Sequence, residues 1–306
     1  MALTRHPILT ARDRLLLNGL LDYGLLTLAQ VQACYFPTSQ TTIQAGQRTR
    51  RYGVTTTVLN RLYALEKAGW VALSTHAETA RYPDTRVVWL GRGAAQVMAQ
   101  ELKLPIQVLH WHKPHSRLMQ IPHDLMATTL RLRLETALRQ QPECELVEWL
   151  SGRLLAADSD SIAYTLPLDG RQVKKTRRIV ADSFCVLSCG GSISRFPIET
   201  DHSSLSQTRI LKEKIHAGLA YIHSPQYRKR YGDNQGRWLF VMESEKRLKN
   251  LQALVLRELG KVAASAFYFT SFEAVKTQNV LTDPIWWLGG AAQTPQALWY
   301  ALKNRV

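Results

Sequence analysis

Apolar positions recur at helical spacing through the first hundred residues, with capping and stop signals between them. The tetrapeptides T-A-R-D, from position 10, and T-L-A-Q, from position 27, match the capping box that opens a helix. The helices that they predict end at Gly24 and before Pro37, because glycine terminates helices readily and proline cannot continue one. A polar stretch, 38–53, then separates them from the next apolar segment.

The segment 55–68 predicts an amphipathic helix with two different faces. Its apolar side chains recur at the spacing of a buried face: Val58, Leu59, Leu62 and Leu65. The opposite face carries small and polar groups, which suit the major groove of DNA: Thr56, Thr57, Asn60, Arg61 and Ala64. Gly69 ends the helix, and the segments 70–73 and 86–90 predict the two strands of a hairpin.

Three short helices followed by a hairpin form the element order of a winged helix-turn-helix domain, which we place at residues 1–104. The span between the two strands is the predicted wing. We predict DNA contacts from this helix, the wing and the polar stretch: Arg48, Arg50, Arg51, Thr56, Thr57, Asn60, Arg61, Arg81 and Arg86. The alternative is a small helical domain whose wing contacts protein. The helix predicted at 91–104 either packs on this domain or forms a homodimer, and the pattern leaves both open.

The second half has the pattern of a mixed α/β domain. Three prolines and no sustained period mark residues 105–122 as a linker, so the second domain covers 123–306. Its helices are predicted at 124–140, 206–222 and 245–259, and its strands at 146–150, 179–187, 194–200, 237–242 and 266–270. The whole chain is therefore expected to be α+β.

Charge favours a polyanionic partner, and double-stranded DNA is the one we expect. The formal net charge is +15. Residues 1–120 carry 14 basic and 6 acidic side chains (+8), and residues 121–306 carry 25 and 18 (+7).

The four cysteines show no CxxC pairing, and we expect buried free thiols in a reducing cytoplasm. No apolar run approaches a membrane span, so no membrane partner is expected.

Candidate chemistry lies in the carboxylates Asp182, Glu199 and Asp201. Asp182 is predicted within one strand and Glu199 near the end of the next, so a hairpin through Gly190-Gly191 would point both into one cleft. Clustered carboxylates repel one another, and a divalent cation such as Mg²⁺ relieves the repulsion. The alternative is ordinary ion pairing with the neighbouring Arg177, Arg178 and Arg195.

The runs ADSFCVL and FPIETDHSS, a following helix with Lys214, and RWLFVMESEKR together resemble the replication-relaxation family of plasmids and integrative elements, over about residues 8–260. The resemblance implies a winged helix followed by a PD-(D/E)xK nuclease-like domain. It also implies a role in plasmid replication, relaxation or mobilisation, with a relaxase or replication protein as a candidate partner.

Carried over by position, Ala181-Asp182 matches the PD element of that family's nuclease-like domain, and Glu199-Thr200-Asp201 matches its (D/E)xK element. Asp201 stands where the pattern has lysine. Lys214 is the best substitute for that lysine, the alternative being a solvated helix lysine. The resemblance therefore favours a DNA-binding accessory protein of a plasmid or mobile element, with a degenerate nuclease-like domain. The first alternative is an active nuclease with Mg²⁺ held by Asp182, Glu199 and Asp201 and assisted by Lys214. A winged-helix transcriptional regulator is the second.

Overall fold

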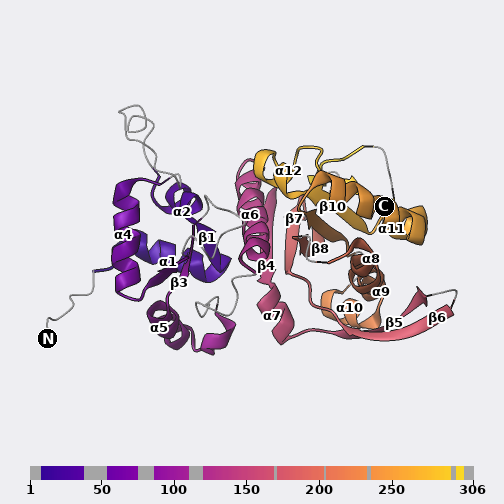
Figure 1. Cartoon of the computed structure of the whole chain (residues 1–306), viewed down its shortest axis with the longest axis horizontal. Helices are drawn as coiled ribbons and strands as arrows, with labels where there is room; N and C mark the ends of the chain where they lie inside the picture. Colours follow the sequence, from indigo (N-terminus) through magenta and orange to yellow (C-terminus); the bar gives the residue numbers. More distant parts are fainter. Residues whose placement is uncertain are drawn as a thin grey trace. The chain divides into compact units, whose positions relative to one another are not determined.

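A computed structural model describes residues 8–37, 54–74, 86–109, 120–168, 171–202, 205–232, 236–290 and 294–299. The chain forms two compact units, residues 1–128 and 129–306. Both contain helices and strands, which confirms the predicted α+β class (Figure 1). In the described ranges, no helix combines the length and the apolar character that crossing a bilayer requires.

Unit 1 combines helices with a small antiparallel sheet. Its elements are α1 (Ala11–Tyr23), β1 (Leu25–Thr27), α2 (Leu28–Tyr35), α4 (Thr56–Lys67), β2 (Val71–Leu73), β3 (Val87–Leu90), α5 (Arg92–Leu102) and the 3₁₀ turn η2 (Ile106–Val108). The strand order is β1-β3-β2. Leucines from α1 and α4, among them Leu16, Leu20, Leu62 and Leu65, are fully buried. The predicted helices and hairpin strands are confirmed, and β1 is an addition to them.

Local signals explain where these helices begin and end. Both predicted capping boxes are present, with Asp13 N donating to Thr10 Oγ1 and Gln30 N donating to Thr27 Oγ1. Gly69 closes α4 with a φ of 77°. The amide of the next residue, Trp70, bonds the Leu65 carbonyl at 2.9 Å, which is the Schellman arrangement.

Unit 2 is built on a six-stranded mixed sheet. The helix α6 (Ile121–Leu138) crosses the division between the units, and Arg133 in its second half donates to the Val275 and Gln278 carbonyls. The strands are β4 (Cys144–Ser151), β7 (Ser183–Cys189), β8 (Ser192–Asp201), β9 (Trp238–Met242), β10 (Phe267–Ser271) and β11 (Trp287–Leu288). Their order is β11-β10-β9-β8-β7-β4, with β8, β9 and β10 parallel.

Helices cover the sheet of unit 2. They are α7 (Gly152–Ala157), α8 (Gln207–Ile210), the π-helical turn η4 (Leu211–Ile215), α9 (His216–Ile222), α10 (Pro225–Tyr231), α11 (Glu245–Ala264) and α12 (Phe272–Thr277). A buried cluster joins sheet residues such as Phe240 and Phe269 to helix residues such as Ile215 and Leu251. The helices α8, η4, α9 and α11 therefore cover the face of the sheet on which Phe240 lies.

Two further strands form a separate ribbon. Strand β5 (Ser161–Leu168) pairs antiparallel with β6 (Arg171–Arg178) along the full length of both. The pattern analysis did not predict these strands, and it also missed α7, α10, α12 and β11. In Figure 1 the ribbon extends away from the sheet of unit 2.

The cysteines differ from the prediction of buried free thiols. Cys144 on β4 and Cys189 on β7 lie directly opposite each other, 4.2 Å apart between their Cα atoms, and form a disulfide. Cys34 and Cys185 are thiols outside this disulfide, and Cys34 is exposed whereas Cys185 is buried. The prediction is therefore correct only for Cys185. The register of β4 against β7, which a single sequence does not reveal, is what brings the pair together.

Candidate functional site

The outer face of α4 is the first candidate surface. Thr56, Thr57, Asn60 and Tyr63 are exposed, whereas Val58, Leu59, Leu62 and Leu65 are buried, so the helix has the two faces that its sequence predicts. Its N-terminus is held from α2, because Gln32 Oε1 accepts bonds from Thr55 N at 3.0 Å and from Thr55 Oγ1 at 3.3 Å. The exposed face is thus presented by a helix that is fixed at its first turn.

Arg61, predicted to contact DNA, has a partner within unit 1. Its guanidinium bonds both carboxylate oxygens of Asp13, whose side chain is 1% exposed, and donates to the Ile8 carbonyl at 2.8 Å. Burial raises the pKa of Asp13, but hydrogen bonds from Arg61 and Thr10 outweigh burial and hold it below its ordinary value. Arg61 therefore joins α4 to α1.

Arg86 lies beside the outer face of α4. Its Nη1 donates to Tyr63 Oη at 2.9 Å, and the guanidinium lies 5.7 Å from the centre of that ring. Its Nε donates to the Ser74 carbonyl at 3.0 Å, which fixes the side chain at the base of the hairpin. One predicted cation is thus placed next to Tyr63 on α4. The other predicted arginines, Arg48, Arg50, Arg51 and Arg81, lie outside the described residues.

The second candidate site lies where β7 and β8 pair. Gly190 and Gly191, with φ of 55° and 80°, make the tight turn between them. Asp182 lies at the bend just before β7, not inside a strand as predicted, and its backbone N bonds Ile198 O at 3.0 Å. This pairing places Asp182 beside Glu199. Thr200 N donates to Asp182 Oδ2 at 2.7 Å.

Lys214 completes this group from the π-helical turn η4. Its Nζ lies 2.7 Å from Glu199 Oε2, and its side chain is 23% exposed against 6% for Glu199. A π-turn widens the helix by one residue, and such turns are frequent at functional sites. The lysine is therefore not a solvated helix lysine. We call Asp182, Glu199 and Lys214 the carboxylate–lysine cluster.

The pKa values of Glu199 and Lys214 depend on each other's charge and on that of Asp182. Burial, followed by the nearby charge of Asp182, raises the pKa of Glu199 to about 8, although Lys214 opposes the shift. Burial lowers the pKa of Lys214, but the attraction of Glu199 and Asp182 outweighs burial and raises it. At neutral pH a pKa of about 8 leaves Glu199 mostly protonated, beside a protonated Lys214.

Asp201 does not join the cluster. Both of its carboxylate oxygens accept bonds from Arg247 on α11, one of them at 3.1 Å from Nη2. Within the part of the chain that the structure describes, no three His, Cys, Asp or Glu side chains are grouped so that they could hold a metal ion together. Two adjacent carboxylates nevertheless fit the donor set of Mg²⁺, which commonly takes one or two carboxylates with waters and phosphate oxygens. Arg247 is thus the partner of Asp201, and the sequence analysis did not predict this pair.

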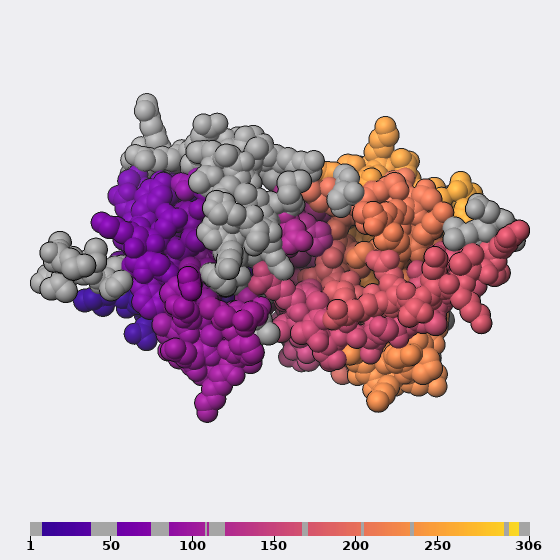
Figure 2. Space-filling view, turned by 60° about the horizontal axis from the view of Figure 1, so that its bottom comes forward, coloured from indigo at the N-terminus to yellow at the C-terminus, as the bar shows by residue number. Residues whose placement is uncertain are grey.

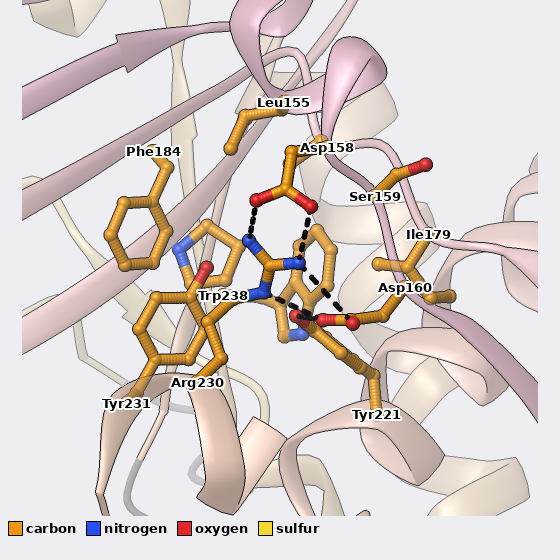
Figure 3. Close-up of a pocket in the computed structure, with 12 residues that line it drawn as sticks. Leu155, Asp158, Ser159, Asp160, Ile179, Phe184, Tyr221, Arg230, Tyr231 and Trp238 are labelled. Atoms are coloured by element: carbon orange, nitrogen blue, oxygen red, sulfur yellow. Dashed lines mark hydrogen bonds and ion pairs between the residues drawn. The ribbon is translucent and has the colours of Figure 1, made fainter. Parts of the chain in front are cut away.

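A polar network lies where the ribbon begins, and Figure 3 shows it in a pocket with aromatic walls. Arg230 on α10 donates to Asp160 Oδ2 at 2.8 Å and to Asp158 Oδ2 at 2.9 Å. Tyr221 Oη donates to Asp160 Oδ2 at 2.7 Å. Burial raises the pKa of Asp160, but these hydrogen bonds outweigh burial and lower it. The network attaches the segment before β5 to α9 and α10.

Comparison with known proteins gives one match. A family model described as replication-relaxation matches residues 17–236, which is more than half of the chain and includes the α4 surface and the carboxylate–lysine cluster. No curated protein and no solved structure matches the chain.

Proposed function

Since the chain belongs to the replication-relaxation family, we propose that it is a DNA-binding accessory protein of a plasmid or mobile element. Membership of this family supports a role in the replication or relaxation of such elements. We propose further that unit 1 acts as a winged helix and reads duplex DNA with α4. The observation that carries it is the exposed polar face of α4, which presents Thr56, Thr57 and Asn60 together with Tyr63, the residue that Arg86 contacts.

The physical case for α4 rests on what its exposed groups can bind. Asn60 can make paired hydrogen bonds with the edge of adenine, and Thr56 and Thr57 can bond either bases or phosphates. Arg86 supplies a positive charge that phosphate attracts. The buried face of the same helix keeps these groups turned outward.

The test is selection of a preferred duplex from a random pool with the full chain, followed by affinity measurements on that duplex. Asn60→Ala is expected to weaken binding by about 1–3 kcal/mol at the preferred sequence and to leave binding to unrelated duplex nearly unchanged. Exposed Gln96→Ala on α5 is the matched control. A preferred sequence that Asn60→Ala binds as well as the native chain does would contradict the proposal.

A second candidate function is Mg²⁺-dependent cleavage of a phosphodiester, and the 2.7 Å contact between Lys214 and Glu199 favours it. Asp201 stands at the motif position of the lysine, but Lys214 brings an ammonium group to the motif glutamate from η4. Asp182 and Glu199 would hold the metal. When bound, the metal would activate water and offset charge on the phosphate. Lys214 orients the Glu199 carboxylate and is placed to stabilise negative charge that develops beside it.

Incubation of the protein with supercoiled plasmid and Mg²⁺ or Mn²⁺ distinguishes the two candidate functions. Nicking that is lost in Asp182→Asn, Glu199→Gln and Lys214→Met would establish the nuclease. Intact plasmid together with sequence-dependent duplex binding would leave the accessory function alone. Exposed Glu258→Gln controls for loss of a carboxylate elsewhere in unit 2.

A further inference from the structure

The β5–β6 ribbon carries a concentration of positive charge that the proposed function has not used. Residues 161–178 contain Arg171, Lys174, Lys175, Arg177 and Arg178 against a single acidic residue, Asp169, so their formal charge is 5 − 1 = +4. Two of the arginines have partners within unit 2. Arg177 pairs with Glu213 at 3.2 Å, and Arg178 donates to Ser159 Oγ and the Ala156 carbonyl.

The other three cations are exposed. These are Arg171, Lys174 and Lys175 on β6, and they form no ion pair with any of the described residues. Figure 2 shows the surface of this part of the chain, coloured rose, uncovered at one edge of unit 2. These side chains are therefore available to a partner.

Register distributes the three cations over both faces of the ribbon. Lys174 lies opposite Thr165 on one face, whereas Lys175 lies opposite Tyr164 and Arg171 opposite Leu168 on the other. An eight-residue strand is roughly 25 Å long. A two-stranded ribbon fits the major groove of a duplex, where cations on both faces meet phosphates of both strands.

The ribbon is fixed at its base, and the fixed end adjoins the carboxylate–lysine cluster. Ile179 N bonds the Asp160 carbonyl at 2.8 Å, and Arg230 holds the Asp160 side chain. Tyr164 Oη donates to the Lys212 carbonyl at 3.4 Å, which joins β5 to η4. Asp182 follows the end of β6 by only four residues. The ribbon is therefore held in place on unit 2 by contacts at its base.

We propose that the β5–β6 ribbon is a second DNA-contacting surface, which binds the duplex backbone without regard to sequence through Arg171, Lys174 and Lys175. It rests on the proposed function, because it assumes that the protein binds duplex DNA. It adds a contact in unit 2 that is independent of the α4 surface.

The experiment measures binding of the full chain to a duplex of unrelated sequence by fluorescence anisotropy over a series of salt concentrations. The ribbon variant is Arg171→Ala/Lys174→Ala/Lys175→Ala. Its control, Arg257→Ala/Lys261→Ala/Lys276→Ala, removes the same charges from exposed positions on α11 and α12. Each phosphate contact contributes about 0.9 to the slope of log affinity against log salt. The ribbon variant is expected to flatten that slope by about 2–3, and the control to leave it within about 0.5.

The possible results separate the two proposals. Equal slopes for the ribbon variant and the control, with a native chain that binds duplex, would overturn the ribbon proposal alone. No duplex binding by the native chain would overturn the proposed function itself. Lys174→Arg/Lys175→Arg, which keeps the charge, must retain the native slope, and matching thermal midpoints check that the variants fold. Tighter ribbon-dependent binding to vesicles of anionic lipid than to DNA would also reject the assignment.

Discussion

At the scale of single residues, the two polar groups on neighbouring positions of α4 have different roles. Asn60 is exposed and Arg61 is bonded to buried Asp13. The pattern of a helix predicts which face a residue occupies, and it placed both residues on the polar face. It does not predict that an arginine at the edge of that face reaches a carboxylate 48 positions earlier in the chain.

Arg61→Ala is expected to lower the free energy of unfolding of unit 1 by about 2–4 kcal/mol, because it leaves the buried Asp13 carboxylate without its cation. Asn60→Ala is the matched neighbour and is expected to change stability by less than about 0.5 kcal/mol. Chemical denaturation followed by circular dichroism measures both. Equal stability of the two variants would show that the ion pair contributes little.

Glu199 is expected to make the stability of unit 2 depend on pH. Its pKa of about 8 in the folded chain exceeds that of an ordinary glutamate, so its contribution is complete below about pH 4.5 and is lost as pH rises to 8. The free energy of unfolding should therefore fall with rising pH, by up to about 1.4 kcal/mol per unit in that window. Denaturation of the metal-free protein between about pH 5 and 9 measures this slope.

The Glu199→Gln variant removes the titrating group and should flatten that slope. Glu258→Gln, at a position whose side chain is 37% exposed, should keep it. A slope of native size in Glu199→Gln would mean that another group titrates there.

At the scale of elements, the pattern analysis predicted most of the elements whose apolar residues alternate or recur, and it missed the β5–β6 ribbon. The helices α1, α2 and α4 and the pair β7–β8 have clear periods and turn residues. Strand β6 has Val173 as its one aliphatic residue, so no alternation marks it. The dipeptide Asp169-Gly170 after β5 was a usable hairpin signal, and Ile162, Tyr164 and Leu166 alternate before it.

The candidate site was predicted only in part, because local pattern predicts strand pairing but not the packing of helices over the sheet. The pairing of β7 with β8 follows from Gly190-Gly191, and it placed Asp182 beside Glu199 as expected. The contact of Lys214 depends on the π-turn, and the partner of Asp201 is Arg247, 46 residues away. Contacts of this kind depend on how helices pack over the sheet, which local pattern does not specify.

Asp160→Asn is expected to loosen the ribbon as an element. The change weakens the bonds from Arg230 and Tyr221, so the amides of β5 and β6 should exchange hydrogen with solvent several times faster. Asp158→Asn is the matched control on the same arginine, and its side chain, 84% exposed against 20% for Asp160, should matter much less. Hydrogen exchange with mass spectrometry measures both. Equal exchange in the two variants would show that the network does not hold the ribbon.

At the scale of the whole molecule, the disulfide and the proposed α4 surface lie in different units. The disulfide Cys144–Cys189 closes 45 residues within unit 2, and unit 1 contains no half of it. Closing a loop of that size stabilises a fold by about 2–4 kcal/mol. The sequence preference proposed for α4 should not depend on this bond.

Reduction of the protein is therefore expected to lower the stability of unit 2 and to leave the sequence preference of duplex binding unchanged. Thiol titration in denaturant should count two reactive groups before reduction and four afterwards. Cys144→Ser should reproduce the loss of stability, whereas Cys34→Ser should not. Four thiols before reduction would show that the chain as purified lacks the bond.

The bond between Arg61 and Asp13 has a consequence for genetics. A screen for alleles that fail to bind an origin or promoter would recover changes at Asp13 on α1, although that side chain is buried. Such alleles should be temperature-sensitive and rescued by slower growth in the cold, whereas alleles at Asn60 should be defective at every temperature. Phenotype against temperature would thus sort supporting positions from contacting ones before any complex is solved.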